Sequence, residues 1–219
     1  MLPFPRIIQY GNNAQTGHYV LNLDFTRQTV GDTNIIDYSS NTHTFTKLNT
    51  GQANIVLDST LGTNVMYFNG AVFSTPMVSD LQLVSKYFEI DVVYKSFSNA
   101  IQVLYGTGYY PDVTNRIGGI CHQIKQYDGN DQYFIDDGTT FNRNLLPSST
   151  EAQWQRLVYS RTSSGVNIKR YRNGTLINQA NFADYPYANG TSFGVGGYYK
   201  TPTNYLFYGY MQYLKVKVF

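Results

Sequence analysis

The segment WQRLVYSRTSSGVNIKRYRNGTLI, residues 154–177, holds the pattern that decides the fold. Apolar and polar residues alternate through WQRLVYSR and again through GVNIKRYR, which is typical of half-buried β-strands. The clusters RTSSG and RNGT separate these stretches and favour sharp turns. In RNGT, Gly174 takes the second position of a two-residue Asn-Gly turn, where a positive φ is needed. The segment therefore predicts consecutive antiparallel strands.

The same alternation extends along most of the chain. It recurs in HYVLNLDFT, NVMYF, KYFEIDVVY, AIQVLYG, DQYFI and YLFYGYMQYLKVKVF. In HYVLNLDFT, we expect Tyr19, Leu21, Leu23 and Phe25 to share one face. No window has a convincing helical period with a cap. We predict an all-β fold, a two-sheet antiparallel sandwich of the jelly-roll type over residues 18–219, preceded by an N-terminal arm, residues 1–17.

Bulk properties disfavour several classes of partner and fold. The 219 residues carry a net charge of +2 from 16 basic and 14 acidic side chains, with no run of either sign. This disfavours a nucleic-acid backbone or an anionic membrane as partner. With one cysteine, Cys121, no intramolecular disulfide can form. The start MLPFPRIIQYGNN lacks an apolar stretch of signal-peptide length, so we expect synthesis in the cytoplasm. The 21 tyrosines indicate a recognition surface without naming its ligand.

Several separated pieces together resemble the laminin G-like branch of the concanavalin A-like lectin and glucanase sandwiches, in the form found in bacteriophage structural proteins. They are YVLNLDF with IIDYSSNTHTFT, whose turn is similar to "D-S-S-x-x-x-H", then NVMYFNG, KYFEIDVVY, the hairpin at 154–177, and GVGG with YGYMQYLKVKV. The ordered set spans residues 18–219. The resemblance implies a lectin-like sandwich and a phage virion protein. Gln212 and Tyr213 stand where the family commonly has acidic residues.

Two carboxylates, Glu89 and Asp91, share one face of the expected strand FEIDVVY, opposite Phe88 and Ile90. Laminarinase-type hydrolases with this sandwich carry the signature E-x-D-x-x-E, and here the third acid is replaced by Tyr94. A retaining mechanism needs a second carboxyl about 5–5.5 Å from the first. We therefore expect no catalysis. The acids either line a polar face that hydrogen-bonds sugar hydroxyls or lie on the solvent side of the sheet.

No metal or cofactor is expected. Cys121 and His122 are adjacent on a strand and point to opposite faces, so they cannot form a nucleophile–base pair, and Cys121 is expected to be a buried structural residue. The three histidines lack the spacing of zinc ligands. In YDGNDQ, Asp128 and Asp131 could hold a weak calcium ion, although a plain hydrophilic turn is the simpler interpretation.

Tyrosine pairs beside glycine and proline mark two loops as ligand-binding candidates. Tyr109 and Tyr110 lie in GTGYYPDVTNR, and Tyr198 and Tyr199 in GGYYKTPTNYLFYGY. They could stack on a sugar ring or anchor a neighbouring subunit, or simply cover hairpin ends. The N-terminal arm is either a docking segment or a disordered leader. Its candidate docking residues are Pro3, Phe4, Pro5, Arg6, Ile7, Ile8 and Tyr10.

Together these features predict a non-enzymatic virion protein on the tail, fibre or capsid surface of a phage. Its expected partners are other virion proteins, through the arm, and a host-surface glycan, and we expect a homo-oligomer or many copies on a particle. Two alternatives stay open: a capsid decoration protein without a ligand, and a laminarinase-like glycoside hydrolase.

Overall fold

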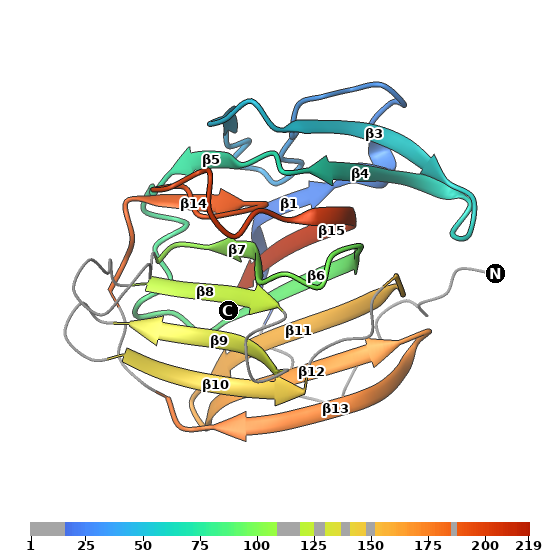
Figure 1. The fold of residues 1–219 in the computed structure, drawn as a ribbon. Coiled ribbons are helices and arrows are strands. Elements are labelled where there is room, and N and C mark those ends of the chain that lie inside the picture. The colour runs from blue at the N-terminus through green and yellow to red at the C-terminus, as the bar shows by residue number, and fades with distance from the viewer. Residues whose placement is uncertain (1–15, 109–118, 125–129, 137–140, 148–151, 185–187) are drawn as a thin grey trace.

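The fold is a sandwich of two antiparallel β-sheets, which confirms the fold class predicted from the sequence (Figure 1). The computed structural model describes residues 16–108, 119–124, 130–136, 141–147, 152–184 and 188–219. Within these residues the one helical element is the short 3-10 turn η1, Phe25–Arg27. No helix in this part of the chain has the length and hydropathy of a membrane span.

Two sheets account for all the strands in the described residues. Sheet I has the order β13-β12-β11-β6-β15-β4-β3, and β1 also pairs with β15. Its strands are β1 (His18–Asp24), β3 (Gln52–Asp58), β4 (Thr63–Asn69), β6 (Phe88–Ser96), β11 (Gln155–Thr162), β12 (Gly165–Arg172), β13 (Thr175–Phe182) and β15 (Tyr208–Val218). Sheet II has the order β10-β9-β8-β7-β14-β5-β2. Its strands are β2 (Thr46–Lys47), β5 (Phe73–Pro76), β7 (Gln102–Gly106), β8 (Gly119–Ile124), β9 (Asn130–Asp136), β10 (Phe141–Pro147) and β14 (Ser192–Val195).

The last strand, β15, organises sheet I. It pairs with β6 from Gly209 opposite Ser96 to Val218 opposite Phe88. On its other side, its first half pairs with β4 and its second half with β1. The register of β15 therefore decides which side chains of β4 and β6 become neighbours on the outer face of the sheet.

The first strand departs from the predicted alternation. A bulge lies between Tyr19 and Leu21, and both Val20 and Leu21 are buried. The extra residue of a bulge changes which face the preceding side chains take. Tyr19 is 39% exposed, so the prediction that it shares the core face is wrong. Leu23 and Phe25 are buried as predicted, although Phe25 already belongs to η1.

The main core lies between the sheets and is rich in phenylalanine. Phe68 of β4 is fully buried there. Near its ring lie those of Phe25, Phe73 and Phe207, with centroids 6.4, 6.2 and 5.6 Å away. Two of these contacts are edge to face, a geometry that aromatic quadrupoles favour.

Where β8–β10 face β11–β13, the core is polar as well as aromatic. Arg170 of β12 pairs with Asp131 of β9, and neither side chain is exposed. Arg170 also donates to the carbonyl oxygen of Pro147. His122 stacks on Tyr133 with centroids 4.2 Å apart, and its Nε2 lies 3.9 Å from Asp131 Oδ2. Burial lowers the pKa of His122 and outweighs the opposing effect of Asp131, so the ring is neutral at pH 7.

The Asn-Gly turn predicted from the sequence joins β12 to β13. Arg172 pairs with Thr175 across it. Asn173 and Gly174 have φ of 49° and 79°. Positive φ at both central positions is the geometry that matches the twist of the flanking strands, so the prediction for Gly174 is confirmed.

Candidate functional site

Strand β6 has one core face and one outer face, as its alternation predicts. Phe88, Ile90 and Val92 belong to the main core. Glu89 and Asp91 alternate with them and therefore lie on the outer face of sheet I, away from sheet II.

Asp91 is held in a charged network on this face. Arg156 donates from Nε and Nη2 to its two carboxylate oxygens, at 2.9 and 2.8 Å. The Tyr213 hydroxyl donates to the same carboxylate, at 3.3 Å from either oxygen. Burial acts to lower the pKa of Arg156, but its hydrogen bonds with Asp91 and the Asp91 charge outweigh this and raise it. Because both oxygens are engaged, Asp91 positions Arg156 and Tyr213 and is poorly placed to exchange protons with a ligand.

Glu89 is held less firmly. The Ser160 hydroxyl donates to its carboxylate at 3.3 Å. Burial raises the pKa of Glu89, and the neighbouring Asp91 charge raises it further, while Arg156 partly offsets both. A raised carboxyl pKa is typical of general acids but also follows from simple burial.

The remaining position of the hydrolase signature is Tyr94, whose ring is buried in the main core. Residues five apart on a regular strand lie on opposite faces, so Tyr94 and Glu89 cannot share a surface. Since Asp91 is bound to Arg156, β6 offers Glu89 no second unengaged carboxyl.

Glu89→Gln is expected to raise the free energy of unfolding at pH 7 by up to about 1 kcal/mol, because it removes a half-buried charge beside Asp91. The pKa of Glu89 is raised in the folded state. The cost of its charge is thus absent below the unfolded pKa of about 4.3 and develops as the pH rises through the folded value. Urea denaturation should show that Glu89→Gln is more stable than the unaltered protein at pH 7 and that this difference disappears at about pH 3. Destabilisation at pH 7 would contradict this reading.

Tyr198 does not lie at the surface as predicted. It is 1% exposed and packs with Val103, Cys121 and Phe134 on the outer face of sheet II. The ring of Tyr205 meets it edge-on, with centroids 5.8 Å apart. The prediction that Tyr198 stacks on a ligand is therefore corrected, because the loop after β14 folds back over sheet II and buries it. The same cluster confirms that Cys121 is a buried structural cysteine.

Of the other tyrosines predicted to bind a ligand, the structure describes only Tyr199. Tyr199 is half-buried, and its hydroxyl lies 3.2 Å from Thr191 Oγ1, within hydrogen-bonding distance. Tyr109 and Tyr110 lie outside the described residues. So does the predicted docking arm from Pro3 to Tyr10. For these residues the predictions stay predictions.

The predicted hydrophilic turn at YDGNDQ is not borne out at Asp131. Its side chain is fully buried and paired with Arg170, so it is not available to an ion, while Asp128 lies outside the described residues. Among the residues that the structure describes, no three histidine, cysteine, aspartate or glutamate side chains group as metal ligands would.

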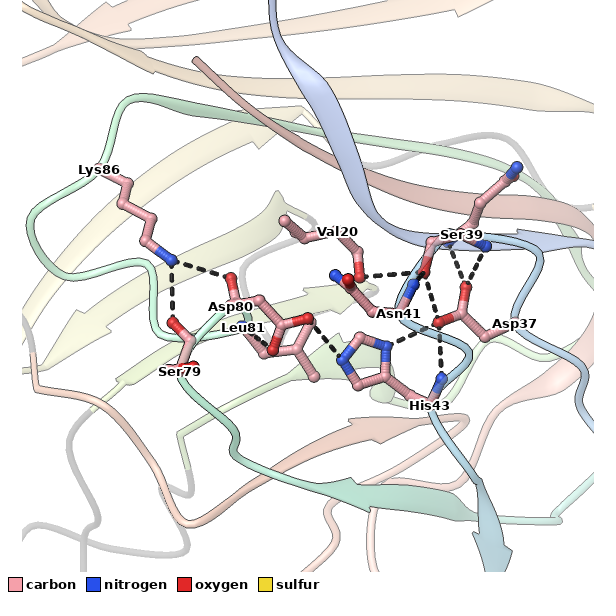
Figure 2. Close-up of polar contacts among 10 residues, drawn as sticks. Val20, Asp37, Ser39, Asn41, His43, Ser79, Asp80, Leu81 and Lys86 are labelled. Carbon is pink, nitrogen blue, oxygen red and sulfur yellow. Dashed lines mark hydrogen bonds and ion pairs between the residues drawn. The ribbon is translucent and has the colours of Figure 1, made fainter.

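A second polar cluster lies where the segment after β1 meets the loop before β6 (Figure 2). Asp37 accepts hydrogen bonds from the backbone amides of Asn22, Ser39 and His43, each at 2.9 Å. His43 Nδ1 lies 2.6 Å from Asp37 Oδ2, and His43 Nε2 lies 2.9 Å from Asp80 Oδ2. The imidazole therefore bridges two segments through two carboxylates.

This cluster is built to fasten the fold. Burial acts to raise the pKa of Asp37, but the backbone hydrogen bonds from Ser39, His43 and Asn22 outweigh it and lower the pKa. A catalytic triad needs a nucleophile on the second ring nitrogen of its histidine, and here that nitrogen faces Asp80. The sequence located Asp37 and His43 in one turn but gave no sign of Asp80, which reaches them only through tertiary packing.

An aromatic patch that sequence reasoning missed lies on the outer face of sheet I, at the ends of β6, β4 and β15. It consists of Tyr67, Phe97, Tyr208 and Tyr210, and we call it the Tyr210 patch. The Tyr210 ring meets Phe97 and Tyr67 edge-on, with centroids 4.7 and 5.6 Å away. Phe97 and Tyr208 are 41% and 37% exposed.

The Tyr210 patch has a firm base and free polar tips. Trp154, which is buried, stacks on Tyr210 at 6.2 Å and packs with Val65 and Val93. Within the described part of the chain, no hydrogen bond engages the hydroxyls of its three tyrosines. The alternation of YGYM predicts a strand, but the approach of Phe97 depends on the β6–β15 register, which the sequence does not show.

No protein-family model matches the sequence, and no curated protein matches it significantly. Solved structures do match. Domain 4 of AbnA, a GH43 extracellular arabinanase from Geobacillus stearothermophilus, was solved in complex with arabinotriose. It aligns with a TM-score of 0.63 and 16% identity over 92% of this chain and 93% of its own. The chain shares the β-sandwich fold of this domain.

Two toxin domains are also similar in fold. The binding domain of Paraclostridial Mosquitocidal Protein 1 aligns with a TM-score of 0.58 and 14% identity, and that of botulinum neurotoxin serotype D with 0.59 and 13%. Each alignment covers 91% of this chain but 48% and 47% of theirs, so the chain spans about half the length of these toxin domains. At such identities the likeness concerns the fold alone.

Proposed function

We propose that this domain is a non-enzymatic glycan-binding module and that it contacts its ligand through the Tyr210 patch. The observation that carries the proposal is a group of four aromatic rings, two of them exposed. The hydroxyls of its three tyrosines have no hydrogen-bond partner within the described part of the chain. Tyrosine presents an apolar face and a polar tip, so such a group can both stack on a sugar ring and hydrogen-bond its hydroxyls.

The fold comparison and the state of the carboxylates support this proposal. Domain 4 of AbnA, which has the same fold, was solved with arabinotriose bound. The engagement of Asp91 by Arg156 and the burial of Tyr94 speak against the laminarinase-like alternative. A binding role needs neither residue to be reactive.

Removing the exposed rings of the patch tests the proposal. Phe97→Ala and Tyr208→Ala are each expected to weaken glycan binding at least tenfold, because each removes stacking area at the centre of the contact. Glycan-array hits with the unaltered protein, followed by calorimetry, provide the measurement. Tyr87→Ala is a matched control, since Tyr87 is also 41% exposed but lies beyond the opposite end of β6.

Two results would contradict the proposal. One is the absence of any array hit at high protein concentration. The other is a change in oligomeric state for Phe97→Ala and Tyr208→Ala without a change in glycan binding, which would make the patch an interface between copies of this chain.

We further propose that the domain is displayed on a phage particle, at the tail, fibre or capsid surface, and that the N-terminal arm docks it to other virion proteins. The resemblance of residues 18–219 to the laminin G-like domains of phage structural proteins supports this role. A portal, capsid or tail gene beside the coding sequence, and the protein in purified particles, would bear it out. The alternative is a capsid decoration protein without a ligand, which would give no hits on the glycan array.

A further inference from the structure

We infer that the ligand of the Tyr210 patch is an acidic glycan and that Lys95 holds its carboxylate. This inference rests on the proposed function and adds the chemical class of the ligand. It is drawn from the position of Lys95, from the rings around it, and from the lack of a carboxylate partner for it among the described residues.

Lys95 lies within the Tyr210 patch. It stands opposite Tyr210 in the β6–β15 register, and Tyr210 in turn stands opposite Tyr67 of β4. Its Nζ lies 5.7 Å from the ring centroid of Phe97 and 5.9 Å from that of Tyr210. The ammonium is therefore held beside two rings on which a sugar could stack.

Two cations on the outer face of sheet I have acidic partners, whereas Lys217 has none within 4.0 Å among the described residues. Arg156 is paired with Asp91, and Lys215 Nζ lies 3.1 Å from Asp24 Oδ2. For Lys95, no carboxylate of the described residues lies within 4.0 Å. The patch thus combines aromatic rings with a positive charge that the described part of the chain leaves without a counter-ion.

The rings attract the ammonium of Lys95 but do not neutralise its charge. The negative face of an aromatic ring attracts a cation within about 6 Å, but the ring carries no net charge. A carboxylate on a stacked sugar would supply the missing charge, and the hydroxyls of Tyr67, Tyr208 and Tyr210 could bond the sugar's own hydroxyls. A neutral sugar would use the rings and leave the charge unpaired. A sulfate ester could take the place of the carboxylate, because it also carries a negative charge and oxygen atoms that accept hydrogen bonds from an ammonium.

The test compares matched acidic and neutral glycans. Sialyllactose against lactose, and oligogalacturonate against its methyl ester, isolate the carboxylate, while a sulfated and an unsulfated lactose isolate the sulfate. At low salt the unaltered protein should bind at least one acidic member about tenfold more tightly than its neutral partner, and added salt should reduce the difference. Lys95→Met should lose about five- to tenfold in affinity for the acidic member alone, and Lys95→Arg should keep most of it. Lys200→Met, which removes the same charge from an exposed loop position, is the control.

Each outcome decides a different point. Equal binding of the acidic and neutral members, unchanged in Lys95→Met, would overturn the inference and leave glycan binding standing. An equal loss for both members would make Lys95 a packing residue and would also overturn it. No binding to any member or to the wider array would overturn the proposed function itself. Thermal melting of each variant confirms that the domain is folded.

Discussion

Arg170→Met is expected to lower the free energy of unfolding by about 3–5 kcal/mol, because it leaves the Asp131 carboxylate buried without its cation. Neither side chain of the pair is exposed, and Arg170 also donates to the Pro147 carbonyl. A charge this far from water is costly unless it is paired and hydrogen-bonded. Urea denaturation followed by the fluorescence of the one tryptophan, Trp154, measures the loss.

A double variant separates the charge from the packing. Asp131→Leu combined with Arg170→Met removes both charges, so it should be markedly more stable than Arg170→Met alone. Lys200→Met, an exposed change of the same kind, should stay within about 0.5 kcal/mol of the unaltered protein. A loss below about 1 kcal/mol in Arg170→Met would mean that water or another group neutralises Asp131.

Asp37→Asn is the second large change, with an expected loss of about 2–3 kcal/mol at pH 7. The buried carboxylate accepts three hydrogen bonds from backbone amides and a fourth from the Ser39 hydroxyl at 2.7 Å. It also contacts His43 Nδ1. An amide cannot accept all of these, because one of its two polar atoms is itself a donor. The hairpin after β1 and the loop carrying Asp80 would lose their common anchor.

The pH dependence of this loss follows from the lowered pKa of Asp37. A depressed pKa contributes stability that is fully present above the unfolded value of about 4 and is lost as the pH falls through the folded value. The gap between the unaltered protein and Asp37→Asn should thus close as the pH falls below about 4. His122 titrates in both proteins, so its effect cancels in the difference.

A neighbouring aspartate gives the control for Asp37. Asp32 accepts a single exposed hydrogen bond, from the Thr29 amide at 2.9 Å. Asp32→Asn should therefore cost under about 1 kcal/mol at pH 7. A pH-independent gap for Asp37→Asn would show that Asp37 is not ionised in the fold.

The candidate site illustrates where sequence reasoning succeeds and where it stops. Sequence reasoning placed Glu89 and Asp91 together on one face of a strand, because the alternation of side chains is a local property of the backbone. It could not foresee that Arg156 would engage Asp91, since that contact joins β6 to β11. Tyr198 looked like a surface residue beside glycines, but its exposure depended on how its own loop, after β14, packs on sheet II.

By itself, the sequence determined the all-β class, the strands of alternating residues, the Asn-Gly reversal at Gly174 and the two faces of β6. Each of these follows from steric limits and side-chain periodicity within a few residues. Only the tertiary structure decided the Tyr210 patch, the bridge through His43 and the buried pair of Asp131 and Arg170. These depend on strand register and on sheet-to-sheet packing, which bring together side chains whose separation along the chain carries no local signal.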